Sequence, residues 1–596
     1  MEAKERSSVE KIYKWAVEDI FATDEDWERE YSEIQERIKD IETFKGKLSD
    51  KETFKKAMKT NLSIMQRLDR LYIYSSMKND EDTRVAKYQA MNNKAQELFA
   101  AAAALASFIE PEIISLGKEK FDDFIKTDSE IKFYEHYLDN IFRKQKHILS
   151  DKEENILSAL SPALNAVDEV YGIFSDADLT FPNVKNSKGE ERELTGTNFT
   201  LLLESDDRTL RKNAYEVYYE RLGSFGRTAA GMLQGCVSRH IALSKLRGYP
   251  SARAAALDYN SVPESVYDRL VEAVHNKISS LHSYVSLRKK SLKIEDLKMY
   301  DIYTPIVEDV DKKYSIDEAK EIILGALKPM GEEYCNIVNS AFKERWIDYY
   351  ENPGKRGGAY SGGSYDTKPY ILLNYHGNLD NVFTMIHELG HSIHSYFSRK
   401  NNDFLYGSYP IFLAEIASTT NEMLLNEYLI RHESDPEVKK YLLNHLMDSF
   451  KGTLYRQTMF AEFEQSIHAQ YQEGKPLTSD GLREEYRKLN HFYYGEDIES
   501  DELIGMEWAR IPHFYYDFYV FQYATGISAA SAFYKRILDG GAEMANIYIN
   551  NFLKSGDTKY PIETLKTAGL DMNDPKVVED ALSIFQNAID EFGKMK

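Results

Sequence analysis

The chain has 596 residues, of which 42% are hydrophobic and 29% charged, and its formal net charge at pH 7 is −22. This acidic balance argues against nucleic acid as a partner, because phosphates attract a basic surface, and it disfavours anionic membranes. The first ten residues contain no apolar leader, and no later stretch offers about eighteen uninterrupted apolar residues, so we expect a cytoplasmic protein. Two cysteines, Cys236 and Cys335, are too few for a disulfide framework, and both are expected to be reduced.

Residues 1 to 110 are predicted to form several long helices. Apolar residues repeat at intervals of three and four after Asp24 and after Asp50, and both aspartates are suitable N-caps. The alanine-rich run 99–107 is a strong helix former. We expect this N-terminal helical lobe to be a scaffold that encloses a site, with a separable binding domain as the alternative.

Residues 111 to 200 are predicted to continue as helix, with a cap at Ser150, and then to form a β-hairpin. Segments 179–184 and 191–194 flank Asn186-Ser-Lys-Gly189, which has the composition of a hairpin turn. A domain boundary is expected near residue 200. Beyond it, long helices are predicted to about residue 296, and segment 299–306 could be extended or a short helix.

The stretch from Asn352 to Tyr375 changes character. It is rich in glycine, and Ile371-Leu-Leu-Asn-Tyr375 is typical of a strand. An exposed strand edge can hold an extended peptide through main-chain hydrogen bonds, whatever the peptide sequence. This interpretation gains weight from the metal-binding motif that follows about a dozen residues later. An ordinary turn-rich hairpin is the alternative interpretation.

The next segment carries His387, Glu388 and His391 in the order H-E-x-x-H, within a run whose apolar residues keep helical spacing. Residues four apart lie on one face of a helix, so both imidazoles can bind one zinc ion while the glutamate reaches a water in its open position. By itself the motif also arises by chance. His394 is expected to be a packed residue rather than a ligand.

The third ligand is expected from a later element, because the motif lacks the glycine and third histidine of the longer zinc motif. The best carboxylate is Glu415, which lies 24 positions after His391, enough for a loop and the start of a second helix. Glu422, two turns later, is a reasonable hydrogen-bond partner for a ligand histidine, or a solvated helix residue.

The last candidate segment is Trp508 to Gly526, in which aromatic residues are concentrated. Aromatic stripes are usually packing. A tyrosine hydroxyl or a histidine N–H placed opposite the metal could, however, donate to a carbonyl oxygen as it becomes an oxyanion.

Several stretches together resemble the oligoendopeptidase F members of the thimet-oligopeptidase family of zinc peptidases: 357–365, 369–375, 387–391 and 414–419. The resemblance extends from Trp15 to Pro561. It implies a mainly α, two-lobed metallopeptidase with the metal deep in a cleft or channel, acting on short unfolded peptides. The family carries a histidine followed by two tyrosines seven residues apart, which points to His513, Tyr516 and Tyr523, with Tyr519 as a competing choice.

These features predict a mainly α metallopeptidase with a small β-sheet near the zinc helix, divided into 1–110, 111–200 and a catalytic domain 201–596. One Zn²⁺ per chain is expected on His387, His391 and Glu415, with Glu388 as general base. The predicted activity is zinc-dependent hydrolysis of internal bonds in oligopeptides. The alternatives are a zinc carboxypeptidase or dipeptidase, or a non-catalytic peptide-binding protein, against which the intact Glu388 argues. The oligomeric state is left open.

Overall fold

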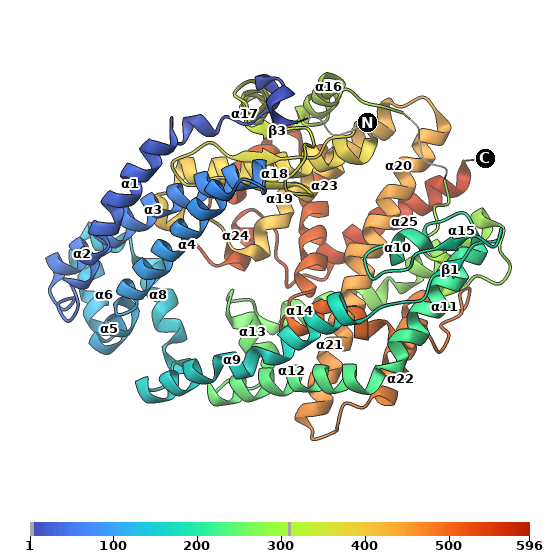
Figure 1. Ribbon diagram of the computed structural model, residues 1–596, viewed down its shortest axis with the longest axis horizontal. Coiled ribbons are helices and arrows are strands. Elements are labelled where there is room, and N and C mark those ends of the chain that lie inside the picture. The colour runs from blue at the N-terminus through green and yellow to red at the C-terminus, as the bar shows by residue number, and fades with distance from the viewer. Residues whose placement is uncertain (1–4, 308–311, 596) are drawn as a thin grey trace. The chain divides into compact units, whose positions relative to one another are not determined.

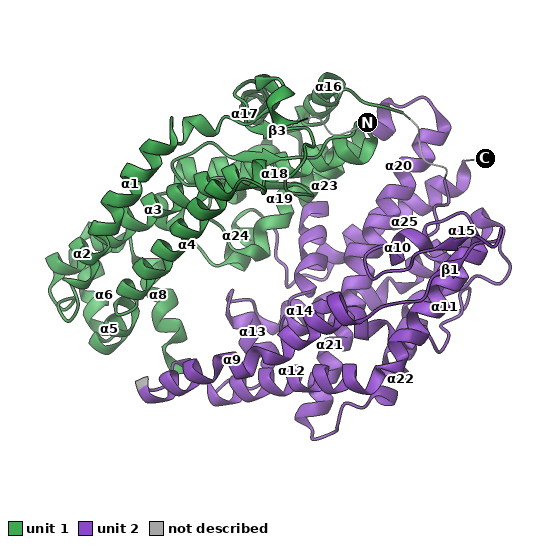
Figure 2. Cartoon of the chain, viewed as in Figure 1, with its two compact units in different colours: residues 1–146, 311–428, 533–569 green, residues 147–310, 429–532, 570–596 purple. Residues whose placement is uncertain are grey.

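The computed structural model describes residues 5–307 and 312–595, and helices dominate it (Figure 1). The predicted mainly α fold is therefore confirmed. The chain forms two compact units, each assembled from three separated segments (Figure 2). Unit 1 comprises 1–146, 311–428 and 533–569, and unit 2 comprises 147–310, 429–532 and 570–596. The predicted division of the chain into domains at residues 110 and 200 stays a prediction.

The N-terminal part of unit 1 is helical, as predicted. Its α-helices are α1 (Asp24–Arg37), α2 (Lys39–Glu42), α3 (Lys51–Glu81), α4 (Ala86–Ala106), α5 (Ile109–Leu116), α6 (Lys118–Thr127), α7 (Ser129–Lys132) and α8 (Glu135–Lys144). Asp50 caps α3, accepting a hydrogen bond from the Thr53 N–H at 2.9 Å. The cap of α1 is Thr23 rather than Asp24, because Thr23 forms a reciprocal capping box with Asp26.

Helices α3 and α4 pack along each other around a core that includes Trp27, Leu71 and Met91. Within the described ranges 5–307 and 312–595, one helical stretch, Ala86–Leu116, could cross a membrane by length and composition alone, with a mean hydropathy of 1.5. A single stretch of this kind is weak evidence for a membrane span, since helices of soluble proteins pass the same test.

The rest of unit 1 carries a small three-stranded sheet. Its elements are α16 (Ile316–Ala326), α17 (Glu332–Lys343), β3 (Ile347–Asp348), β4 (Tyr360–Gly362), β5 (Tyr370–Leu372), α18 (Leu379–Asn401), α24 (Pro561–Thr567) and the start of α19 (Ile411–His432). The strand order is β3-β5-β4, in which β3 pairs with β5 in parallel and β4 pairs with β5 antiparallel. The hydroxyls of Ser361 in β4 and Ser392 in α18 are hydrogen-bonded to each other at 2.8 Å. The predicted small sheet beside the motif helix is confirmed.

Unit 2 is built from long helices and one hairpin. Its elements are α9 (Asp151–Ile173), β1 (Val184–Lys185), β2 (Glu191–Arg192), α10 (Phe199–Leu203), α11 (Arg208–Ser224), α12 (Gly226–Leu246), α13 (Ala252–Asp258), α14 (Glu264–Asn276), α15 (Ile278–Leu292), α20 (Pro436–Ser449), α21 (Arg456–Gln472), α22 (Ser479–Tyr494) and α25 (Lys576–Lys594). Helix α23 (Phe521–Tyr548) begins in this unit. Ser150 caps α9 as predicted, through a capping box with Glu153.

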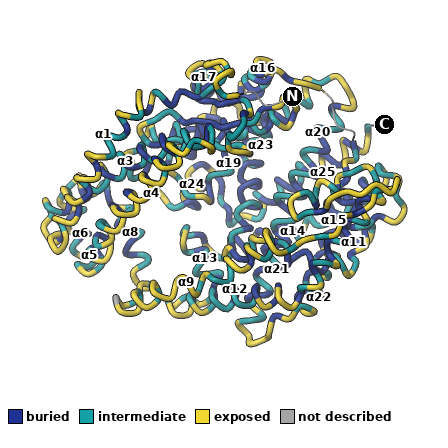
Figure 3. Tube along the Cα trace, in the orientation of Figure 1, coloured by how far each residue is buried: buried dark blue, intermediate teal, exposed yellow. Residues whose placement is uncertain are grey.

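The hairpin is also confirmed: β1 and β2 pair antiparallel, and Gly189 turns the chain with a φ of 80°. Segment 299–306, which the pattern left open, contains the short 3-10 helix η6 (Met299–Asp301). Helix α9 is the most exposed of the long helices in unit 2, and Tyr171 is its one buried side chain among those described (Figure 3).

Candidate metal centre

Helix α18 positions the H-E-x-x-H residues. It begins after Asn378, whose side chain accepts a hydrogen bond from the Asn381 N–H at 2.9 Å and so satisfies a free donor of the first turn. The apolar residues at helical spacing form its fully buried side: Val382, Ile386, Leu389 and Ile393. This packing fixes the rotation of the helix about its axis, and with it the direction in which His387 and His391 point.

The two histidines and Glu415 bring three donor atoms together. His387 Nε2 lies 3.2 Å from His391 Nε2, and Glu415 Oε2 lies 3.4 Å from the first and 3.5 Å from the second. Tetrahedral zinc with bonds of about 2.0–2.2 Å separates neighbouring ligand atoms by about 3.3–3.6 Å. The spacing and the donor types therefore fit one zinc ion, with a fourth position left for water or substrate.

Helix α19 supplies the third donor and also orients the first histidine. Glu422 Oε1 accepts a hydrogen bond from His387 Nδ1 at 2.9 Å, which leaves the Nε2 lone pair for a metal. The Ser418 hydroxyl donates to Glu415 Oε2 at 3.1 Å. The hydrogen-bonding role suggested for Glu422 is thus present in the structure.

Gly390 allows α18 and α19 to approach closely enough for this arrangement. A Cβ built on Gly390 would lie 2.5 Å from Ser418 Cα and 2.9 Å from the Ala417 carbonyl oxygen. Only a residue without a side chain fits at this crossing. Sequence reasoning missed the role of Gly390, although a glycine inside a strongly helical segment is itself a signal of close backbone approach.

Glu388 is mostly buried beside the triad. Burial, with the nearby carboxylates of Glu415 and Glu422, raises the pKa of Glu388 above the ordinary glutamate value. A glutamate whose pKa lies closer to neutrality is a better base for taking a proton from water and returning it.

His394 is a packing residue, as expected. Its ring stacks on Tyr409, with centroids 3.7 Å apart, and neither ring nitrogen has a hydrogen-bond partner among the described residues. Burial, followed by the neighbouring His391, lowers the pKa of His394 to about 3. The neutral imidazole of His394 therefore packs against Tyr409 and is not part of the triad.

The aromatic candidates lie in unit 2 and contact one another there. The His513 ring lies 5.6 Å from that of Tyr516 and 5.9 Å from that of Tyr523, and Tyr519 lies 5.4 Å from Tyr523. Burial, followed by the charge of Arg456, lowers the pKa of His513, which keeps its ring neutral. Tyr516 is 56% exposed, so its hydroxyl is open to a ligand.

Comparisons with known proteins agree along the whole chain. The model of Peptidase family M3 matches residues 201–584, and a second model, Oligopeptidase F, matches residues 112–181. The chain is 44% identical over 592 residues to oligopeptidase PepF of Bacillus subtilis, covering 99% of this chain and 88% of that protein. It is 46% identical over 595 residues to the chromosomal oligoendopeptidase F of Lactococcus lactis, and the match covers 99% of this chain and 98% of that protein.

A solved structure supports the same assignment. The crystal structure of oligoendopeptidase-F from Enterococcus faecium has a TM-score of 0.74 and 39% identity, and the match covers 96% of this chain and 99% of that one. Family model, full-length relatives and structure thus agree with the resemblance seen in the motifs. The chain belongs to peptidase family M3, within its oligoendopeptidase F group.

Proposed function

We propose that this peptidase is a zinc-dependent endopeptidase that hydrolyses internal bonds of short unstructured peptides, with zinc on His387, His391 and Glu415. The observation that carries the proposal is the convergence of three donor atoms, 3.2 to 3.5 Å apart, beside a buried glutamate on the same helix. The full-length likeness to proteins named oligoendopeptidase F supports the preference for internal bonds.

The residues divide the chemistry among them. When bound, zinc would polarise the scissile carbonyl and lower the pKa of a water in its open coordination position. Glu388 takes the proton of the attacking water and then delivers it to the leaving amine. Glu422 holds His387 in the tautomer that presents Nε2 to the metal.

Strand β4 is the candidate holder of the substrate main chain. The sequence pointed to segment 371–375, but β5 is the central strand and is paired on both sides. No described strand pairs with the outer edge of β4, and Ser361 in β4 contacts Ser392, the residue after His391. An extended peptide added to this edge would be held by main-chain hydrogen bonds that tolerate any side chain.

The aromatic cluster is the candidate for oxyanion stabilisation. His513, Tyr516 and Tyr523, with Tyr519 as the alternative, offer an imidazole and phenol donors within one small group of rings. Donors aimed at the oxygen that becomes negative in the transition state supply a large part of the rate in acyl transfer to water.

A short, internally quenched peptide blocked at both ends tests the proposal. We expect cleavage inside the peptide, located by mass spectrometry, that a chelator abolishes and added zinc restores. Cleavage of unblocked peptides only would favour a carboxypeptidase or dipeptidase. Cleavage that survives complete metal removal would refute the metal mechanism.

A further inference from the structure

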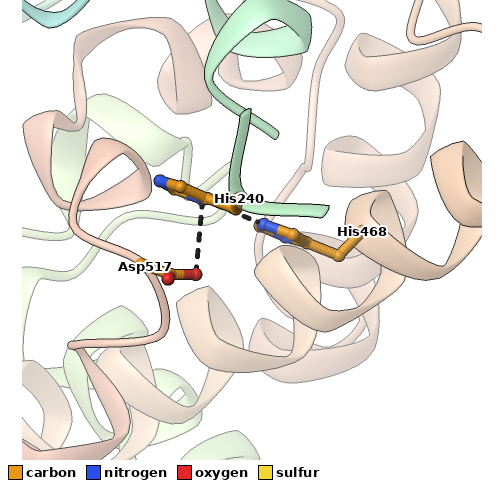
Figure 4. A group of neighbouring side chains, drawn as sticks. All are labelled: His240, His468 and Asp517. Carbon is orange, nitrogen blue, oxygen red and sulfur yellow. Dashed lines mark hydrogen bonds and ion pairs between the residues drawn. The ribbon is translucent and has the colours of Figure 1, made fainter. Parts of the chain in front are cut away.

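Unit 2 contains a second group of metal-ligating side chains, formed by His240, His468 and Asp517 (Figure 4). His240 comes from α12, His468 from α21, and Asp517 from the turn after the 3-10 helix η11 (Pro512–Tyr515). These residues are far apart in the sequence. The same segment, 512–518, carries His513 within η11 and Tyr516 directly after it.

Two of the three donor distances match those of the triad in unit 1. His240 Nδ1 lies 3.2 Å from His468 Nε2 and 3.3 Å from Asp517 Oδ1, and all three donor atoms lie within 4.8 Å of one another. The two short distances match the edge of about 3.3 Å expected for tetrahedral zinc. Two imidazoles and a carboxylate are also the donor set of the unit 1 triad.

The hydrogen bonds around His468 prepare it as a ligand. Its Nδ1 donates to the Glu464 carbonyl oxygen at 2.8 Å, so the lone pair is on Nε2, which faces His240.

Two buried carboxylate oxygens at this place form no hydrogen bond among the described residues. They are Glu464 Oε2 and Asp517 Oδ1, and Asp517 Oδ1 has the ion-pair contact of 3.3 Å with His240 Nδ1. Such groups are costly to bury unless something else satisfies them. A cation bound by Asp517 would satisfy its oxygen directly.

The backbone at this turn is constrained as well. Asp517 and Phe518 both have positive φ, 47° and 58°, a region that a bulky residue such as phenylalanine rarely adopts. The Phe518 N–H donates to Glu464 Oε1 at 2.7 Å. The turn is therefore held against α21 in an unfavourable conformation, which persists only when its surroundings fix it.

We propose that His240, His468 and Asp517 form a second metal site, for a divalent ion of the zinc class, that fastens segment 512–518, with His513 and Tyr516, to α12 and α21. Arg239 Nη2 lies 3.2 Å from His240 Nε2 and can only donate, so Nε2 is the acceptor and the His240 proton is on Nδ1 in the metal-free structure. To bind a metal, His240 would move that proton to Nε2, where Cys236 Sγ, 3.4 Å away, can accept it while Arg239 Nη2 donates to the sulfur at 3.6 Å.

Without a metal, a proton occupies the same space. The two rings are nearly parallel, with 1° between their planes, and an N–H of His240 can point at His468. A bound ion would require the His240 ring to turn from this orientation and Nδ1 to give up its proton. The experiment must therefore distinguish a metal site from a histidine pair joined by a hydrogen bond.

The test is the metal content of the full-length protein loaded with Co²⁺, a spectroscopic substitute for zinc, and freed of loose ions by gel filtration. We expect two equivalents in the unsubstituted chain. His391→Gln, which disables the unit 1 triad, should retain one equivalent with visible absorption bands of tetrahedral cobalt. His391→Gln combined with Asp517→Asn should retain none.

Asp517→Asn preserves the shape of the side chain, and circular dichroism checks that the variant folds. His491→Gln, a substitution of a half-exposed histidine elsewhere in unit 2, is the matched control and should leave both equivalents. The proposal is overturned if the unsubstituted chain binds one equivalent and His391→Gln binds none. Either result leaves the proposed function of the unit 1 triad to be judged separately.

Discussion

At the scale of single residues, Glu388 is the group on which the proposed chemistry depends most. Glu388→Gln removes the base but keeps the size and burial of the side chain, so we expect zinc to remain bound while kcat falls by about 10²–10⁴-fold. Zinc content and peptide turnover measured on one preparation check this. Glu332→Gln, an exposed position in unit 1, is the control and should change neither quantity. Substantial turnover in Glu388→Gln would exclude it as the base.

Glu422 acts on the metal through His387, because its carboxylate accepts the Nδ1 proton at 2.9 Å. In Glu422→Gln the amide oxygen can still accept this hydrogen bond but carries no charge. We expect zinc affinity to fall by about 10–100-fold, as for other residues that orient a ligand histidine. Competition with a chromophoric chelator measures the change. An unaltered affinity would show that the negative charge of Glu422 does not strengthen zinc binding through His387.

The protonation of His387 makes zinc binding depend on pH. Burial would lower its pKa, but hydrogen bonds to Glu415 and Glu422 outweigh burial and raise it to about 10 in the metal-free site. His387 is therefore protonated at neutral pH and must lose a proton to bind zinc. Apparent zinc affinity should rise about tenfold per pH unit from about pH 6 to about pH 8. The same chelator competition, repeated across this pH range, measures how zinc affinity changes with pH. An affinity that did not change would show that His387 carries no extra proton in the metal-free site.

At the scale of elements, the crossing of α18 and α19 holds the triad together. Gly390→Ala places a methyl group 2.5 Å from Ser418 Cα, so the helices must separate and Glu415 must move relative to the histidines. We expect a loss of about 1–3 kcal/mol in the free energy of unfolding and weaker zinc binding. Gly231→Ala in α12, where nothing lies within 4 Å, is the control and should be neutral or stabilising by up to about 1 kcal/mol. Equal effects in the two variants would refute the close-approach argument.

Local signals predicted the elements well. Helical periodicity and capping residues gave the helices around Asp50, Ser150 and the motif, and turn chemistry gave the hairpin at Asn186–Gly189. The sheet in unit 1 was less accessible. Pairing of β5 with β3 and β4 is decided by contacts between segments, so a single sequence could suggest a strand but not which strand would lie at the edge.

At the scale of the whole molecule, each compact unit combines three separated segments of the chain. No composition change marks the return of the chain to an earlier unit. The unit 1 triad could be predicted because two ligands share one helical turn and the third follows in the next long helix. His240 and His468 are 228 positions apart, and no spacing rule connects them with Asp517. Only the fold brings that group together.

Zinc binding should also stabilise the folded protein as a whole. The triad joins two helices of unit 1, and in the unfolded chain its ligands are no longer held together. Free zinc at about 100 times its Kd should therefore raise the free energy of unfolding by about 2.7 kcal/mol for this one site. Chemical denaturation at several zinc concentrations measures the increase, and Glu415→Ala, which leaves the unit 2 residues intact, should remove the part that the triad contributes. If zinc left the denaturation midpoint of the unsubstituted chain unchanged, His387, His391 and Glu415 would not form a metal site in the folded state.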